Sequence, residues 1–496
     1  MGEHIGLAWS WFVDKYGIVV DADIEVRGDT GLIKFRSGSN DFEIIFPLSD
    51  HRDLSMIPIE GFNVYTWFMG RVLENDINSN AVIFAHVNGK KVPCGFIEDN
   101  RLILNFDPFA FIYSVLSGGL DGKDFPVEIP FLDRLSEILF RAIKHLIVSN
   151  GEVLITKSFW PNGKRFAVCL THDVDEIKKT YQYVTRSIRF LKQFNFNRLK
   201  NEFLSLVSKL RGKEPYWTFE EIVRLEEELG VRSSFYFLRE TGKFEILNRK
   251  TWRHLGRRYY FEDVSDVVDY LHSNGWDVGL HGSFYSYTNY DLLKCEKEEL
   301  EKVLGDKVVG IRQHNLNLEI PETWKIHESL SFEYDTTLGS NRYVGFRWGT
   351  CFPFNPIDAE NDARIKILEI PLIVEDIVLF RYPDPWSKFI DTVCKVENVK
   401  GVLTVLWHHA VFNELEYPGW VDIYKKVIEH CKSREAWITS GRRIAEWWKI
   451  RGASRVHYRI RNSRIEISAE NGIPVVVHTS AARLIEGYNV RICIER

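Results

Sequence analysis

Two carboxylates and an imidazole crowd residues 171–175, which read THDVD. The stretch follows the apolar run 166–170, typical of a buried parallel strand, and such strands carry functional side chains at their carboxyl ends. Asp173 and Asp175 would share one face of a regular strand, where both cannot comfortably be buried and ionised. A divalent cation bound by one, with the other left as a base, resolves this conflict. A structural role would also account for the pair, with one aspartate capping the following helix and the other forming a salt bridge.

Histidine and arginine residues stand at the C-terminal ends of two later apolar segments. His281 follows residues 277–280, and Arg312 and His314 follow Gly310. Imidazole nitrogen is a good ligand for zinc, and a guanidinium can hold a carboxylate base by a bidentate contact. We therefore expect a catalytic centre at the carboxyl ends of neighbouring strands.

A histidine pair ends the last strongly apolar strand candidate, residues 402–407. The reference pKa of histidine lies near neutrality, so His408 suits the role of general acid. His409 would face the opposite way in a regular strand. Only one member of the pair is expected to enter the site.

Alternating strand and helix patterns between residues 151 and 450 predict a parallel sheet. Thr218 can cap a helix, with Glu221 completing a capping box, and that helix ends near Gly230 before a strand over 231–238. The pattern recurs over 264–280. Repeated units of this kind imply an α/β sheet, and a closed barrel would gather the candidate residues at one end.

The flanking regions have a different character. Strand patterns over 31–36 and 41–46, followed by an amphipathic helix over 131–147, predict an N-terminal α+β domain that ends near residue 150. Alternating residues beyond 450 predict a small β-rich C-terminal domain over 451–496.

A basic, helix-like segment over 181–214 interrupts the barrel pattern. Its many lysine and arginine side chains stand among aromatic residues, so it could meet a membrane surface or an anionic polymer. The other interpretation is a solvent-exposed helical insertion that lies over the barrel and binds no partner.

Composition narrows the possible partners. The net charge of -5 over 496 residues argues against nucleic-acid binding. The seven cysteines form no CxxC pair, which argues against zinc knuckles and disulfide frameworks. No run approaches 18 apolar residues, and Glu3 with Asp14 makes the first residues unlike a signal peptide, so we expect a soluble, cytoplasmic protein without a transmembrane segment.

Residues 160–450 resemble the polysaccharide deacetylases that contain a NodB-homology domain. The first motif of that family has the form Thr-Phe-Asp-Asp-Gly, and Thr171-His172-Asp173 matches its start. The resemblance makes Asp173 the base. Val174 stands where the metal-binding aspartate is usual, and Asp175 takes the ligand role through an Asp-x-Asp arrangement found in some members.

The other motifs follow in the family's order. His281 matches the first histidine of the His-Ser/Thr-x-x-His motif, Tyr285 replaces the second, and His314 is the candidate replacement ligand. Arg312 matches the arginine that orients the base, and His408 the catalytic histidine of the final motif. Residues 332–338 and 368–372 are also similar to family segments.

The resemblance implies a distorted (β/α) barrel and a metal-dependent hydrolase that removes an acyl group, N-acetyl in the first instance, from a carbohydrate or glycoconjugate. The implied cofactor is a divalent metal ion, with zinc as the first candidate. The metal-bound water would be the nucleophile. Two alternatives stay open on the same fold. One is a metal-dependent hydrolase of a non-sugar C–N bond, and the other is an inactive glycan-binding protein.

Overall fold

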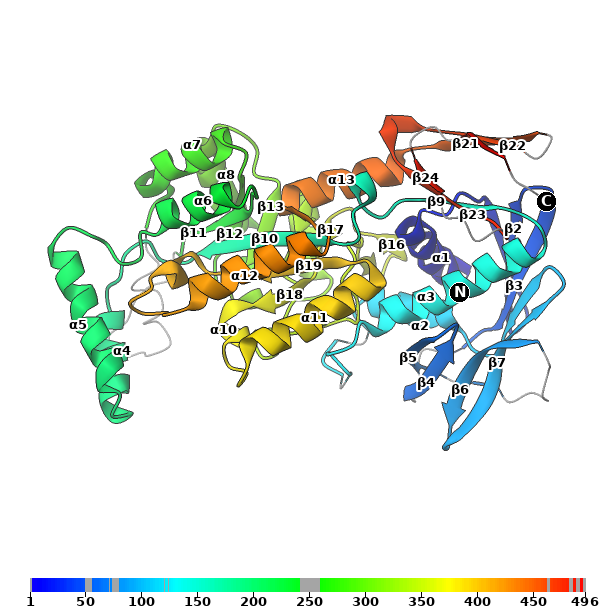
Figure 1. Cartoon of the computed structure of the whole chain (residues 1–496), viewed down its shortest axis with the longest axis horizontal. Helices are drawn as coiled ribbons and strands as arrows, with labels where there is room; N and C mark the ends of the chain where they lie inside the picture. The colour runs from blue at the N-terminus through cyan, green and yellow to red at the C-terminus, as the bar shows by residue number, and fades with distance from the viewer. Residues whose placement is uncertain are drawn as a thin grey trace.

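Two large sheets with their own helices form most of the molecule, which is elongated in the view of Figure 1. The computed structural model describes residues 2–49, 56–70, 72–73, 80–119, 121–123, 125–240, 259–461, 464–480, 485–487 and 491–493. Within these ranges no helix is both long and apolar enough to cross a bilayer.

The first sheet is parallel throughout and has the order β17-β14-β13-β12-β11-β10-β19-β18, with β20 beside the first half of β10. Every residue of β10 is buried, which explains its continuous apolar run. β17 and β18 stand at opposite ends of this strand order but follow each other directly in the chain. The sheet therefore curves until its first and last strands are neighbours. The predicted parallel α/β architecture is confirmed. The strands are β10 (Ala167–Val174), β11 (Ser234–Leu238), β12 (Asp277–Gly282), β13 (Gly310–Gln313), β14 (Tyr334–Asp335), β17 (Leu368–Glu369), β18 (Leu372–Glu375), β19 (Val402–Leu406) and β20 (Trp437–Thr439).

Helices connect these strands and bury one apolar face each. The helix that Thr218 precedes is present, but the predicted capping box is wrong. The Thr218 hydroxyl donates to the His409 carbonyl at 2.7 Å and makes no bond to the helix N–H groups, because the start of α6 packs against the turn that begins at His409. The helices are α6 (Phe219–Glu228), α7 (Ser265–Ser273), α8 (Tyr290–Leu304), α9 (Glu322–Ser329), α10 (Asp376–Leu379), α11 (Pro385–Val399), α12 (Trp420–Ser433) and α13 (Gly441–Ala453). Short 3-10 turns are η1 (Pro161–Gly163), η3 (Phe261–Val264), η4 (Ser286–Thr288), η5 (His314–Leu316) and η6 (His409–Phe412).

The second sheet belongs to the N-terminal region and has the order β1-β2-β3-β8-β7-β6-β4-β5. Its helices share a core with the barrel through Asp133, which is paired with buried Lys15 at 2.7 Å and accepts hydrogen bonds from Thr350 and Cys351. The predicted domain boundary near residue 150 stays a prediction. The elements are α1 (Gly2–Tyr16), β1 (Ala22–Arg27), β2 (Thr30–Ser37), β3 (Asn40–Pro47), β4 (Met56–Gly61), β5 (Val64–Met69), β6 (Ala81–Val87), β7 (Lys90–Glu98), β8 (Arg101–Leu104), α2 (Pro108–Leu116) and α3 (Phe131–Ser149).

The C-terminal strands form two small sheets. One joins β21 (Val456–Arg461), β22 (Arg464–Ala469) and β25 (Arg491–Cys493). In the other, β23 (Val475–His478) pairs with β24 (Ile485–Gly487) and with β9 (Leu154–Lys157). The chain therefore returns at its C-terminal end to the segment that leads into the barrel.

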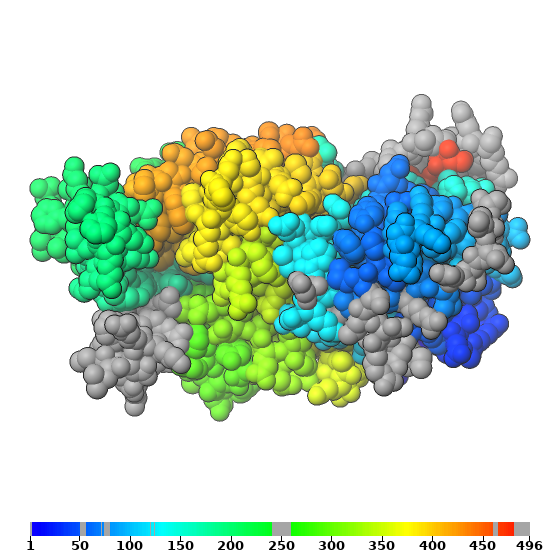
Figure 2. All heavy atoms as spheres, turned by 90° about the horizontal axis from the view of Figure 1, so that it is seen from below, coloured from blue at the N-terminus to red at the C-terminus, as the bar shows by residue number. Residues whose placement is uncertain are grey.

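A helical hairpin is inserted between β10 and α6. It consists of α4 (Gln182–Lys192) and α5 (Phe196–Leu210), which pack against each other. Figures 1 and 2 show the hairpin as a protrusion at the end of the molecule opposite the N-terminal sheet.

Candidate active site

Asp173 and Arg312 form a buried ion pair at the centre of the site. Arg312, on β13, places Nη1 2.8 Å from Asp173 Oδ1 and 2.8 Å from Thr171 Oγ1 on β10. Burial alone would raise the pKa of Asp173, but the positive charges of His281, Arg312 and His408 hold that pKa below its ordinary value. The structure thus gives an ionised carboxylate in a fixed orientation, which is what a general base requires.

His281 faces both aspartates of the first motif. Its Nδ1 lies 2.8 Å from the Arg312 carbonyl and donates to it, so Nε2 is directed at Asp173 Oδ2 (3.5 Å) and Asp175 Oδ1 (3.3 Å). Burial by itself would lower the pKa of His281, and the two carboxylates raise it above its ordinary value. The carboxylates therefore favour positive charge at this point, and a divalent cation would meet the same demand. The carboxylate of Asp175 and the imidazole of His281 are donors that suit zinc.

His314 lies beside His281, with 5.3 Å between the ring centroids. Both side chains are buried, whereas Tyr285 is 53% exposed. The Nδ1 atom of His314 is 3.8 Å from Oε2 of Glu240, a carboxylate just beyond β11. The position that the family motif gives to its second histidine is thus at the surface, and His314 is placed where a third ligand could come from.

His408 is held by a carboxylate that lies just beyond the end of the neighbouring strand β18. Asp376, at the start of α10, accepts from the His408 backbone N at 2.7 Å and from its Nδ1 at 2.8 Å. Burial would lower the pKa of His408, but the Asp376 carboxylate raises it to about 10, so the imidazolium is protonated at neutral pH. His409 is fully buried and stacks on Phe219. Burial lowers the pKa of His409 to about 4, so this ring is neutral.

A pocket of about 290 Å³ contains both Asp173 and His408. Asp175, Arg186 of the hairpin and Tyr417 also line it. Strands β10 and β19 are adjacent and parallel, so their carboxyl ends bring Asp173 and His408 together. A carboxylate and an imidazolium in one small pocket can take a proton from one partner and give a proton to another.

Among the described residues, one group of three has metal-ligand atoms all within 4.8 Å of one another, namely Glu375, Asp376 and His408. Both Asp376 oxygens already accept hydrogen bonds from His408. The geometry therefore fits an oriented acid at this group better than a metal centre.

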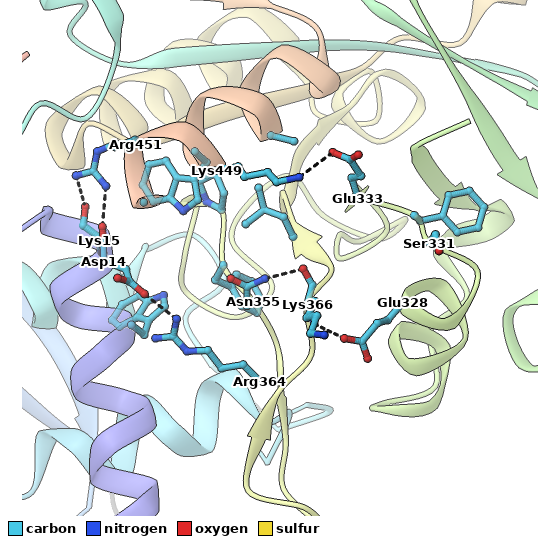
Figure 3. A pocket seen from close by; sticks show the side chains of 18 residues that line it. Asp14, Lys15, Glu328, Ser331, Glu333, Asn355, Arg364, Lys366, Lys449 and Arg451 are labelled. Carbon is cyan, nitrogen blue, oxygen red and sulfur yellow. Dashed lines mark hydrogen bonds and ion pairs between the residues drawn. The ribbon is translucent and has the colours of Figure 1, made fainter. Parts of the chain in front are cut away.

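A larger cavity of about 700 Å³ lies at the other end of the barrel, between α1, α13 and the amino ends of β14 and β17 (Figure 3). Arg364 and Asp14, which both line this cavity, form an ion pair of 2.6 Å. Arg364 lies on β16 (Ala363–Arg364), which pairs with β15 (Ile357–Asp358). Arg451 donates to the backbone carbonyls of Asp14 and Lys15. Its lining contains no histidine and no cysteine, so it offers fewer catalytic groups than the smaller pocket.

Three carboxylates of this region were missed by the sequence analysis. Asp376 and Glu375 follow the apolar run 372–374, and Glu240 follows β11. Burial raises the pKa of Glu375 to about 7. The pattern that identified Asp173, an apolar strand ending in acidic residues, is also present at 372–376 and could have revealed that pair.

No family model and no curated protein sequence matches the chain. Solved structures are similar to it over 58–59% of its length. A protein from Mycobacterium smegmatis that is assigned as a polysaccharide deacetylase is 16% identical, with 59% of this chain and 93% of that chain covered and a TM-score of 0.39. PuuE allantoinase is 13% identical, with 58% and 92% covered and a TM-score of 0.39.

A CE4 family pseudoenzyme from Bacillus anthracis is also similar, at 12% identity, with 58% of this chain and 66% of that chain covered and a TM-score of 0.30. Polysaccharide deacetylases, which the sequence motifs resemble, are thus among the similar structures. At these identities and TM-scores the similarities decide neither activity nor substrate, which have to be argued from the geometry of the site.

Proposed function

We propose that the protein is a metal-dependent hydrolase that removes an acyl group, N-acetyl in the first instance, from a carbohydrate. The observation that carries the proposal is that Asp173, bonded to Arg312, and His408, bonded to Asp376, line the same pocket. The positive charges of His281 and Arg312 lower the pKa of Asp173, and the Asp376 carboxylate raises the pKa of His408. Hydrolysis of an amide needs both a base for the attacking water and an acid for the departing amine.

Asp175 and His281 are the residues that would hold the metal, with His314 as the third ligand. Their chemistry fits because Asp175 Oδ1 lies 3.3 Å from His281 Nε2 and the His314 ring lies beside that of His281, with 5.3 Å between the centroids. When bound, a divalent cation supplies positive charge that polarises an acyl carbonyl and lowers the pKa of water.

The proton transfers belong to the protein's own side chains. Asp173 takes a proton from the attacking water, and its bond to Arg312 keeps the accepting oxygen in place. His408 then gives its proton to the leaving nitrogen, so the acyl group leaves as a carboxylic acid and the amine is released. Asp376 positions the His408 ring through Oδ1, which bonds to Nδ1, while its Oδ2 accepts from the His408 backbone N.

Metal content separates this proposal from the inactive glycan-binding alternative. We expect purified wild-type protein, measured by mass spectrometry, to hold about one zinc or other divalent ion per chain. His281→Ala removes the imidazole that faces both carboxylates and should weaken binding by more than about 100-fold. Asp376→Ala is the matched variant, because it alters the neighbouring Glu375–Asp376–His408 group and should retain metal.

Two results would contradict the assignment. Loss of metal from Asp376→Ala with retention in His281→Ala would move the metal to the other group. No metal in any protein, even after incubation with zinc, would favour a glycan-binding protein on this fold. Circular dichroism of each variant checks that the fold is kept.

A further inference from the structure

The hairpin α4–α5 exposes most of its large apolar side chains. Their exposed fractions lie between 39% and 80%. In α4 they recur every three or four residues, and in α5 Phe196, Phe203 and Leu210 recur every seven, so each helix carries an apolar stripe along one face. Exposed apolar surface of this extent marks an interaction site. The residues are Val184, Ile188, Leu191, Phe194, Phe196, Phe203, Leu204, Leu206 and Leu210.

Polar contacts, in contrast, fasten the hairpin to the barrel. Buried Lys179 lies 2.6 Å from Glu202 of α5 and also binds Glu416 of the barrel. Arg186 of α4 pairs with the same Glu416. A surface helix of a soluble protein normally buries its apolar face and exposes its polar one, and here the arrangement is reversed. Fixed polar contacts hold the apolar stripe toward the outside.

The hairpin is strongly basic although the whole chain has a net charge of -5. Residues 182–213 contain eight lysine and arginine residues and a single acidic residue, Glu202, which is buried. Cationic side chains around an exposed apolar stripe are characteristic of helices that lie in the interface of an anionic membrane. The basic residues are Arg186, Arg189, Lys192, Arg198, Lys200, Lys209, Arg211 and Lys213.

We propose that the hairpin docks on an anionic membrane surface and lies flat in its interface. The longer helix has 15 residues, about 22 Å at 1.5 Å per residue, which is shorter than the apolar thickness of a bilayer of about 30 Å. A second copy of the chain is a poorer partner, because pairing two such stripes would bring like charges together.

Docking would bring the candidate active site to the membrane. The hairpin contributes Gln182, Thr185, Arg186 and Arg189 to the wall of the pocket that contains Asp173. The acylated sugar is therefore carried on a lipid, an inference that rests on the proposed function. A glycolipid whose chain stays in the bilayer would present its sugar directly beside the hairpin.

Vesicle flotation tests the docking independently of any activity. The probes are vesicles of phosphatidylcholine alone and of phosphatidylcholine with 30% phosphatidylglycerol. Wild-type protein should float with the anionic vesicles. Phe196→Glu, Phe203→Glu and Leu210→Glu combined should weaken binding by at least about 100-fold. Arg198→Glu with Lys200→Glu should weaken it by about tenfold or more, and added salt should act in the same direction.

The matched control replaces three exposed apolar residues elsewhere, by Val26→Glu, Tyr65→Glu and Ile450→Glu, and should bind like wild type. The proposal is overturned if wild-type protein does not float with anionic vesicles, or if the hairpin variants float equally well. It is also overturned if the apolar substitutions abolish a dimer in sedimentation analysis while vesicle binding is absent.

The lipid-linked substrate has its own readout. The apolar hairpin variant should slow acetate release from an N-acetylglucosaminyl lipid in the anionic vesicles by at least tenfold, roughly in step with its membrane binding. Its activity on a soluble N-acetylglucosamine tetramer should equal that of wild type. Equal loss on both substrates would overturn the lipid assignment. Absence of hydrolysis on both, with flotation intact, would overturn the proposed function and leave the docking supported.

Discussion

Asp173→Asn is expected to lower kcat by about 10²- to 10⁴-fold, because the amide can still accept a bond from Arg312 but cannot take a proton from water. Arg312 Nη1 lies 2.8 Å from Asp173 Oδ1. Because asparagine has nearly the same shape as aspartate, the substitution changes the proton affinity of this side chain much more than the shape of the site. The measurement is steady-state kinetics on an N-acetylated oligosaccharide, with thermal unfolding recorded in parallel.

Thr171→Val is the matched control for this site. It removes the hydroxyl that contacts Arg312 at 2.8 Å but leaves the charge of Asp173 in place. Its effect on kcat should therefore be much smaller than that of Asp173→Asn. Activity of Asp173→Asn within tenfold of wild type would show that another group is the base.

The second large effect concerns the acid. His408→Gln should lower kcat by about 10²- to 10⁴-fold at every pH, because no proton is then available for the leaving nitrogen. Asp376→Asn should act differently. Burial lowers the pKa of His408, and Asp376 is the main group that raises it to about 10, so its removal lets that pKa fall toward or below the reference value of about 6.5.

The sign of the pH dependence follows from this shift. An acid works below its pKa, so wild-type activity should persist through neutral pH and fall only as pH rises through about 10. In Asp376→Asn the descending limb should move to about pH 6.5 or lower. At pH 8 the variant would then be slower by roughly 30-fold or more, with activity regained as pH falls. An unmoved alkaline limb would remove Asp376 from the role of positioning residue.

Local patterns were sufficient to predict which side chains meet at the carboxyl ends of the barrel strands. Asp173, His281, Arg312 and His408 each end an apolar segment, and parallel strands gather their carboxyl ends at one place. The positions of Asp175 and His314 beside His281 were also predicted, although β10 ends at Val174 and Asp175 lies beyond the regular strand. The ligand roles of these residues stay predictions.

Features that depend on distant contacts could not be predicted. The Thr218 hydroxyl binds His409 because the fold brings the two together, and no local pattern reveals such a partner. The basic hairpin is a similar case, since the face it buries is decided by Lys179 and Glu416. The sequence therefore left both interpretations of residues 181–214 open.

Acetate release from an N-acetylglucosamine tetramer, compared with release of product from small non-sugar amides, tests the central claim most directly. Wild-type protein loaded with zinc should release acetate from the sugar, lose this activity in a chelator and regain it when zinc is restored. Hydrolysis of small amides alone would favour the non-sugar C–N hydrolase. No hydrolysis of either class by metal-loaded protein would contradict the account.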